Sequence, residues 1–287
     1  WPSLARARLA ATDAPDEWQL EGRRVAIAES PLDSAGGRLL LIHDITVAHE
    51  LKANVERNQR LAAMGEMAAS LAHQLRTPLA TALLYSANLA QPDLSDAART
   101  RFAGKATEQL KRLERLIQDV LLFARGESIG RDVIPAASLI AEAAQTMEPL
   151  CREKGVGFSV NAEVGNTIIV GSRKALGGAL LNLLENALQA CEGRNLHNQG
   201  AAEVGLGALV IDRQLSVTVR DTGEGIPPEA QERIFEPFFT TRAQGTGLGL
   251  AIALGVMRAH GGSIEIKSRP GEGSEFVMQL PVVPAEK

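Results

Sequence analysis

The sequence places one histidine where it could act as a nucleophile. His73 lies between Leu71 and Leu75, in a segment whose apolar residues recur at spacings of three and four, as on one face of a helix. At about 100° per residue, His73 points away from that face and into solvent. Thr77 lies one turn further on the same side, and Pro78 removes a helical hydrogen bond and should bend the helix just after the histidine. A neutral imidazole with one free ring nitrogen is a good nucleophile near pH 7. A lone surface histidine is otherwise an ordinary feature.

Two glycine-rich segments could bind a nucleotide. Residues 221–226 (DTGEGI) follow an expected strand, and their glycines would let the backbone approach a flat ligand while a buried carboxylate accepts from an exocyclic amine. Residues 245–250 (GTGLGL) open an expected helix, where successive backbone N–H groups bind phosphate. Taken singly, the first segment favours an ordinary Asp-Gly turn, and the second is a weak signal of phosphate binding.

Two further segments could complete such a site. Asn182 and Asn186 are four residues apart on one helical face, so their amide oxygens could hold Mg2+ and its waters. Alternatively they cap or bridge elements within the core. Residues 235–239 (FEPFF) form either a hydrophobic anchor or the hinge of a mobile cover.

Composition excludes several classes of protein. The 287 residues are 45% hydrophobic and 22% charged, which excludes a disordered, collagenous or disulfide-scaffold protein. The net charge of −4 argues against nucleic acid as a direct partner. No apolar run approaches the roughly 18 residues that a membrane span needs. Cys151 and Cys191 lack metal-ligand spacing and are expected to be reduced thiols in a cytoplasmic protein.

Helical periodicity predicts a hairpin of two long helices. Residues 48–90 and a second segment after Ser95, a plausible N-cap, each carry a heptad seam. The seam residues are Leu61, Met64, Ala68, Leu71 and Leu75 in the first helix, and Ala106, Leu110, Leu113, Ile117, Val120 and Ala124 in the second. One hairpin leaves too much apolar stripe exposed, so we expect a homodimer with a four-helix bundle. The alternative is that the stripe packs on another domain of the same chain.

Strands flank this hairpin on both sides. Residues 24–28 and 38–44 are expected to be strands joined by a turn at residues 33–37. Residues 126–131 are expected to be a linker. The rest predicts a helix layer on a mixed sheet, so the fold class is α+β and multidomain. We expect helices at 136–152, 174–191 and 248–260, strands at 157–160, 167–170, 206–211, 215–220, 263–267 and 275–280, and a loop over 221–247.

Five segments occur in an order that resembles a bacterial sensor histidine kinase. Residues 70–79 (SLAHQLRTPL) resemble the phosphoacceptor box, and residues 182–187 (NLLENA) resemble the N box. Residues 221–226 resemble the first glycine box, residues 235–239 the F box and residues 245–250 the second glycine box. The resemblance covers most of the chain after the first 47 residues.

Three further segments resemble one type of sensor histidine kinase and a subgroup of that type. Residues 187–190 (ALQA) are similar to the nitrogen-regulation (NtrB-like) type, and residues 64–67 (MGEM) and 80–89 resemble its flagellar-regulator subgroup. Residues 24–46 resemble the last strands of a PAS sensor domain that lead into a signalling helix. We therefore expect a partial PAS-like remnant at 1–47, a dimerisation and phosphotransfer hairpin at 48–127 and a catalytic ATP-binding domain at 131–287.

This resemblance implies an ATP-dependent protein-histidine kinase of two-component signal transduction, with a role in flagellar gene regulation. His73 would take the γ-phosphoryl group of ATP and pass it to an Asp of a response regulator, an NtrC-type activator. Thr77 would orient water for a phosphatase reaction. The ATP-binding domain would be an α/β sandwich shared with Hsp90 and MutL, in which Asp221 accepts from the adenine amine and Asn186 coordinates Mg2+. The implied ATP-binding residues are Asn182, Asn186, Asp221, Gly223, Gly225, Arg242, Gly245, Thr246, Gly247, Leu248 and Gly249.

The residue after the phosphoacceptor departs from this family. The family usually has Glu or Asp there, and this chain has Gln74. A carboxylate can accept the imidazole Nδ1–H and stabilise positive charge on the ring, whereas a Gln carbonyl can fix the tautomer but supplies no charge and no general base. We therefore expect His73, Gln74 and Thr77 to support a slower autophosphorylation, which the substitution Gln74→Glu does not reduce.

Two other functions remain open at this point. A signalling scaffold that is non-catalytic or mainly a phosphatase would explain Gln74, but the glycine boxes argue against it. An ATPase of the Hsp90 or MutL kind would explain those boxes, but it would not explain an outward-facing histidine on a dimerising helix.

Overall fold

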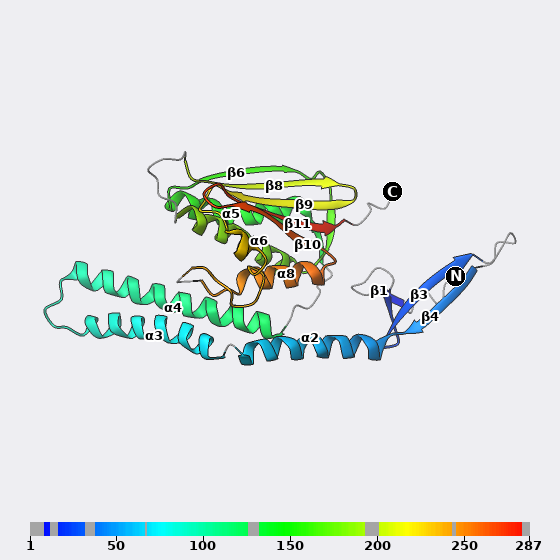
Figure 1. The fold of residues 1–287 in the computed structure, drawn as a ribbon, viewed down its shortest axis with the longest axis horizontal. Coiled ribbons are helices and arrows are strands. Elements are labelled where there is room, and N and C mark those ends of the chain that lie inside the picture. The colour runs from blue at the N-terminus through cyan, green and yellow to red at the C-terminus, as the bar shows by residue number, and fades with distance from the viewer. Residues whose placement is uncertain are drawn as a thin grey trace.

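The computed structural model describes residues 9–11, 17–31, 38–66, 68–125, 132–192, 201–242 and 245–282. Figure 1 shows a small N-terminal sheet at one end, a line of long helices, and a helix-and-sheet unit that lies beside those helices. The expected turn at 33–37 and the expected linker at 126–131 lie outside the described residues. Each helix that the structure describes is too short or too polar to cross a membrane.

The N-terminal sheet is antiparallel, with the strand order β1-β2-β3-β4. Its strands are β1 (Leu9–Ala11), β2 (Glu17–Leu20), β3 (Arg23–Pro31) and β4 (Arg38–Asp44). The predicted pairing of the last two strands is confirmed by a register that sets Ile27 opposite Ile42. Val25 is buried, while Leu41 is largely exposed. The sheet passes directly into the first long helix.

Three long helices follow. They are α2 (Thr46–Glu66), α3 (Ala68–Leu89) and α4 (Asp96–Arg125). The antiparallel pairing of α3 and α4 confirms the predicted helical hairpin (Figure 1). Ser95 caps α4 as expected, because its hydroxyl accepts a hydrogen bond from the N–H of Ala98 at 3.3 Å. Near the end of the hairpin, Tyr85 stacks on Phe102 with ring centroids 6.0 Å apart.

Part of the predicted seam of α4 is exposed in the single chain, as expected of a seam that pairs with a second copy. Leu110 and Ile117 are 52% and 43% exposed, whereas Leu116, outside the predicted seam, is 3% exposed. The buried stripe of α4 instead passes through Leu116 and Phe123, so α4 carries two apolar faces. In the first helix, Leu61 is likewise 45% exposed. A seam derived from spacing cannot tell which face meets the same chain when both faces are apolar.

Pro78 does not end the helix that carries His73. Helix α3 continues from Ala68 to Leu89 with Pro78 inside it. Pro78 lacks the N–H that would bond the carbonyl of Gln74, but its ring is buried. The hydroxyls of Thr77 and Thr81 donate to the carbonyls one turn earlier, at His73 and Thr77, and support the backbone on both sides of the proline.

The C-terminal unit is a mixed sheet covered on one face by helices. Its main sheet has the order β10-β11-β9-β8-β6, in which β6 and β8 are parallel and the other neighbours are antiparallel. The strands of this unit are β5 (Asp132–Pro135), β6 (Gly157–Glu163), β7 (Ile168–Gly171), β8 (Glu203–Ile211), β9 (Gln214–Asp221), β10 (Ser263–Arg269) and β11 (Gly273–Pro281). The helices are α5 (Ala136–Glu153), α6 (Arg173–Glu192), α7 (Pro228–Gln231) and α8 (Gly249–Ala259).

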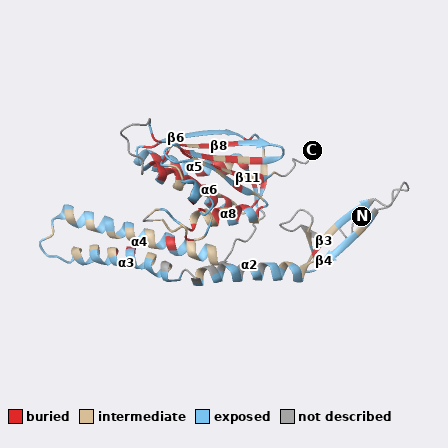
Figure 2. Cartoon of the chain, viewed as in Figure 1, coloured by how far each residue is buried: buried red, intermediate tan, exposed pale blue. Residues whose placement is uncertain are grey.

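Alternating residues of the sheet build most of the core. In β9, Leu215, Val217 and Val219 are buried while their neighbours face outward. Helices α5, α6 and α8 lie between this sheet and the hairpin, and the buried residues gather in this layer (Figures 1 and 2). The predicted α+β class is confirmed, but the sequence reading missed β5 and placed the short α7 in a loop.

Candidate functional site

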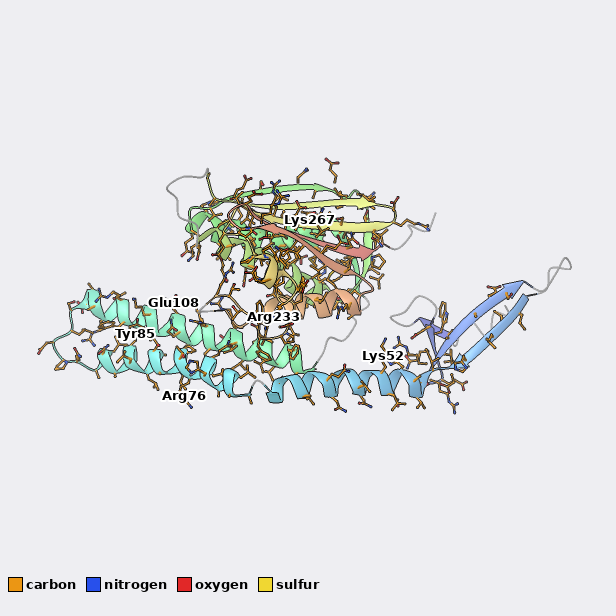
Figure 3. All side chains as sticks on the ribbon, viewed as in Figure 1. Lys52, Arg76, Tyr85, Glu108, Arg233 and Lys267 are labelled. Carbon is orange, nitrogen blue, oxygen red and sulfur yellow. The ribbon has the colours of Figure 1, made fainter. Side chains whose placement is uncertain are left out.

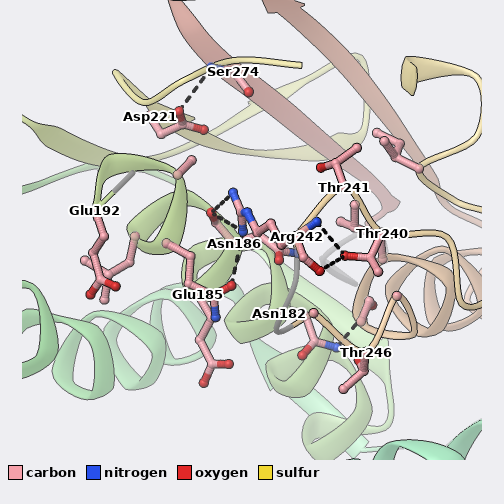
Figure 4. A pocket seen from close by; sticks show the side chains of 18 of the residues that line it. Asn182, Glu185, Asn186, Glu192, Asp221, Thr240, Thr241, Arg242, Thr246 and Ser274 are labelled. Carbon is pink, nitrogen blue, oxygen red and sulfur yellow. Dashed lines mark hydrogen bonds between the residues drawn. The ribbon is translucent and has the colours of Figure 1, made fainter. Parts of the chain in front are cut away.

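A cavity of about 1030 Å³ lies where the helix layer meets the hairpin. Its walls come from α6, from the stretch between β9 and α8, and from α4. The residues predicted to bind ATP that line it are Asn182, Asn186, Asp221, Gly225, Arg242, Gly245, Thr246, Gly247 and Gly249. These predicted residues, up to 67 apart in sequence, are therefore brought together around one space, as Figure 4 shows.

Asp221 closes one end of the cavity at the end of β9. Its side chain is 3% exposed, and its Oδ1 accepts hydrogen bonds from the N–H groups of Gly223 at 2.8 Å and Ser274 at 3.3 Å. Burial raises the pKa of this carboxyl, while those two bonds and the charge of Arg242 act in the opposite direction. Both backbone N–H bonds end on Oδ1, so a donor group of a ligand would meet Oδ2.

Glycine is required at two points in the walls. Gly225 and Gly247 have φ angles of 68° and 67°, in the left-handed region that other residues rarely adopt. A Cβ atom at Gly225 would overlap the carbonyl of Arg269, and one at Gly247 would overlap the backbone of Phe238. The carbonyl of Gly247 also accepts from the N–H of Phe238 at 2.8 Å. The second glycine segment is thus held against the F-box segment.

The two asparagines of α6 face the cavity and differ in their bonding. The Asn182 side-chain amide donates to the carbonyl of Gly249 at 3.2 Å, at the first residue of α8. The backbone carbonyl of Asn186 accepts from Arg242, with both guanidinium distances at 3.4 Å. Arg242 also bonds Gln189 at 3.1 Å and pairs with Glu224 at 3.5 Å, so it reaches across the cavity to α6 (Figure 4).

The expected nucleophile lies outside this cavity. His73 and Thr77 are exposed on α3, and the Thr77 hydroxyl donates to the His73 carbonyl at 3.1 Å. Arg76, three residues after His73, projects from α3 away from α4 (Figure 3). Residues three apart lie on one helical face, so His73 is displayed on the side away from the cavity. The neighbouring Gln74 turns its Oε1 inward, where it is buried and no hydrogen-bond partner is found among the described residues.

Sequence reasoning missed a group of residues that α4 contributes to the cavity. They are Glu108, Gln109, Arg112, Arg115 and Asp119. The Asp119 carboxylate accepts from the Thr246 hydroxyl at 3.4 Å, across 127 residues of sequence. Burial raises the pKa of Asp119 to about 6; the nearby Glu185 adds to this, and the Thr246 bond and Arg115 oppose it. An isolated acid on a heptad helix gives no sequence signal of such a contact.

Two family models match the chain, one over the helical hairpin and one over the unit that contains most of the cavity residues. Residues 63–129, which include His73, match the model of the His Kinase A (phospho-acceptor) domain. Residues 171–284, which include the cavity residues from α6 to β11, match the model described as histidine kinase-, DNA gyrase B-, and HSP90-like ATPase. The chain belongs to the sensor histidine kinase family.

Curated histidine kinases resemble the chain over most of its length. The sensor protein kinase FleS from Pseudomonas aeruginosa is 40% identical over 265 residues, which are 92% of this chain and 64% of FleS. The signal transduction histidine-protein kinase AtoS from Escherichia coli is 30% identical over 248 residues, 86% of this chain and 40% of AtoS. The chain thus spans less than two thirds of the length of either relative. The likeness to FleS supports the predicted flagellar-regulator subgroup.

Solved histidine kinase structures share the fold. The crystal structure of ThkA in complex with the response regulator protein TrrA matches with a TM-score of 0.70 at 24% identity, over 95% of this chain and 79% of that chain. Full-length ShkA in complex with AMPPNP matches with a TM-score of 0.56 at 32% identity, over 77% of this chain and 47% of that one. These matches confirm the predicted helical hairpin and α/β ATP-binding unit of a histidine kinase.

Proposed function

We propose that this chain is an ATP-dependent protein-histidine kinase that phosphorylates His73 and passes the phosphoryl group to an Asp of a response regulator. The observation that carries the proposal is the pairing of an exposed histidine, inside the matched phosphoacceptor region, with a cavity that gathers the residues expected to bind ATP. An Hsp90-like ATPase explains the cavity alone. It gives no role to a phosphoacceptor hairpin.

The two ends of the cavity suit the two ends of ATP. Asp221 lies buried beside Gly223 and Gly225, where Oδ2 of its carboxylate can accept from the adenine amine. The Gly245–Gly249 segment leads into α8, and its backbone N–H groups can bind phosphate at that helix start. Arg242, which reaches across the cavity, would move from the Asn186 carbonyl to a phosphate oxygen when the nucleotide binds.

Mg2+ fits the oxygen groups near the phosphate end. Asn186 supplies an amide oxygen, with Asn182 one turn earlier on the same face of α6. The described residues contain no cluster of three or more His, Cys, Asp or Glu that would hold a metal by itself. The phosphates of ATP would therefore hold most of the ion, which neutralises their charge when bound.

Phosphoryl transfer requires His73 to act as a neutral nucleophile. The lone pair of one ring nitrogen attacks the γ-phosphorus, the bond from that phosphorus to the β–γ bridging oxygen breaks, and ADP leaves. The proton stays on the other ring nitrogen until solvent takes it. Because His73 faces away from the cavity, the ATP-binding unit must change position before this step.

The exposed apolar face of the hairpin supports a homodimer. The residues of this face are Leu79, Leu83 and Leu84 on α3 and Leu110, Ile117 and Leu121 on α4, each between 42% and 62% exposed. Another part of the α4 surface already has a partner, because Val120 and Phe123 pack against the core of the ATP-binding unit. One apolar face of α4 therefore packs on the ATP-binding unit of the same chain, and another stays exposed for a second copy. That second copy would complete the four-helix bundle.

A response regulator of the NtrC type is the partner that we propose, and Thr77 would orient water for the reverse reaction. The cytoplasmic location and the PAS-like nature of the N-terminal sheet remain predictions. The test is transfer of labelled phosphate from the phosphorylated chain to a panel of receiver domains. We expect rapid transfer to the receiver of one NtrC-type activator and slow transfer to the others; absence of transfer to every receiver would contradict the proposed partner.

A further inference from the structure

Asp119 holds the phosphate end of the cavity against the hairpin. Its Oδ2 accepts from the Thr246 hydroxyl at 3.4 Å, and the same hydroxyl accepts from the N–H of Leu248 at 3.3 Å. The hydroxyl therefore links an acid of α4 to the backbone that leads into α8. Among the described residues, no other side chain of the second glycine segment forms a hydrogen bond to the hairpin.

A second contact of α4 is made with the F-box segment, which is hydrogen-bonded to the second glycine segment. Phe123 lies four residues after Asp119, so the two side chains share one helical face. Its ring packs edge-on against Phe238 with centroids 6.1 Å apart and planes at 74°. Phe238 is hydrogen-bonded to Gly247, next to Thr246. One face of α4 thus holds the F-box and glycine segments together, by one polar and one aromatic contact.

The carboxylate of Asp119 also lies in the space that the phosphates of ATP would need. Asp119, Glu185 and Thr246 line the same cavity as the asparagines of α6. A triphosphate with about four negative charges would meet two acids there, and like charges repel strongly where water is excluded. Thr246 cannot at once donate its hydroxyl to Asp119 and to a phosphate oxygen, because a hydroxyl has one hydrogen.

We propose that Asp119 is a positioning residue that docks the second glycine segment on α4 when nucleotide is absent, and that ATP and this docking exclude one another. The inference rests on the proposed ATP binding. It adds that the hairpin competes with the phosphates of ATP, so ATP binding releases the ATP-binding unit from α4. That release is the change of position that His73, on the far side of the hairpin, requires.

The test compares the affinities of the whole chain for ATP and for adenosine, measured by calorimetry with Mg2+ present. In Asp119→Ala we expect ATP to bind about three- to tenfold more tightly and adenosine to bind as in the unaltered chain, because adenosine has no phosphates to compete. The matched control is Glu114→Ala, which removes an exposed acid of α4 that does not line the cavity and should change neither affinity.

An unchanged or weaker ATP affinity in Asp119→Ala would overturn the inference and leave the proposed kinase function intact. Failure of the unaltered chain to bind ATP would overturn both. Hydrogen exchange gives a second readout without nucleotide, for which Asp119→Ser serves if the Ala variant folds poorly. We expect amides 245–248 to exchange faster in the variant than in Glu114→Ala; equal rates would also overturn the inference.

Discussion

Asp221 and Gly223 form a closed turn at the base of the cavity, in which the Gly223 N–H donates to Oδ1 of Asp221 at 2.8 Å. The second oxygen of the carboxylate is the group that we expect to accept from adenine. In Asp221→Asn, the amide oxygen would take over the bonds from Gly223 and Ser274, and the NH2 group would face another donor. We expect ATP and adenosine to bind at least about tenfold more weakly, a loss of about 1.4 kcal/mol.

Calorimetry of both ligands checks this prediction. Asp212→Asn is the control, because Asp212 lies in an exposed turn and already has a positive φ of 49°, which Asn tolerates. Equal affinities in Asp221→Asn and in the unaltered chain would show that adenine binds elsewhere.

Gly171 leaves room for a buried histidine that joins α8 to the start of α6. His260 is 8% exposed; its Nδ1 bonds the carbonyl of Val256 at 2.7 Å, and its Nε2 accepts from the N–H of Ser172 at 3.0 Å. A Cβ atom at Gly171 would overlap this ring and lie 2.8 Å from Nε2. The ring cannot shift without losing one of its bonds, so we expect Gly171→Ala to lower the free energy of unfolding by about 1–3 kcal/mol.

Urea denaturation measures this effect. In the matched variant Gly255→Ala, the new Cβ meets no atom within 4 Å on the exposed side of α8, so a gain of about 0.5–1 kcal/mol is expected. A loss of stability in Gly255→Ala as large as that in Gly171→Ala would rule out the steric explanation.

Gln74 cannot hold the His73 ring in the conformation described. Its Oε1 is buried with no partner found in the part of the chain that the structure describes. Autophosphorylation would require Gln74 to turn outward, and it would still supply no charge. We therefore expect Gln74→Glu to raise the autophosphorylation rate by about tenfold, below the usual range for general acid–base catalysis. The initial rate of labelling by ATP measures it. The control is Gln59→Glu, at an exposed position of α2 that does not line the cavity; a lower rate in Gln74→Glu would contradict the prediction.

Local sequence patterns predicted most of the helices and strands. They did not predict the contacts between the hairpin and the ATP-binding unit. Heptad spacing, the Ser95 cap and the glycine segments predicted the hairpin and most of the ATP-binding unit. The strand Asp132–Pro135 was missed because its four residues have no periodicity and run directly into α5. Asp119 was missed because its partner lies 127 residues away. The burial of Leu116 was missed because the heptad spacing selected only one of the two apolar faces of α4.

Docking through Asp119 should depend on pH. Burial first, and Glu185 second, raise the pKa of the docked carboxyl from 3.8 to about 6, against the effects of the Thr246 bond and Arg115. The docked state therefore binds more protons, so docking is favoured below about pH 4 and weakens as pH rises through 6. ATP affinity should increase by about threefold to tenfold between pH 5 and pH 7.5, less than the full shift allows because the side chain is partly exposed.

Asp119→Asn isolates this effect from the titration of ATP itself. The amide oxygen can still accept from Thr246, but it does not titrate in this range. The ratio of the two affinities, variant to unaltered chain, should therefore fall as pH rises. A ratio that stays constant from pH 5 to pH 7.5 would refute a titrating contact.

Formation of phosphohistidine at residue 73 tests the central claim most directly. After incubation with γ-labelled ATP and Mg2+, the account predicts a label on the chain that is stable in alkali and lost in acid. The label should be absent in His73→Ala and retained in His43→Ala, which removes another exposed histidine. A label of the same size in His73→Ala, or steady ATP hydrolysis with no labelled chain, would contradict the account.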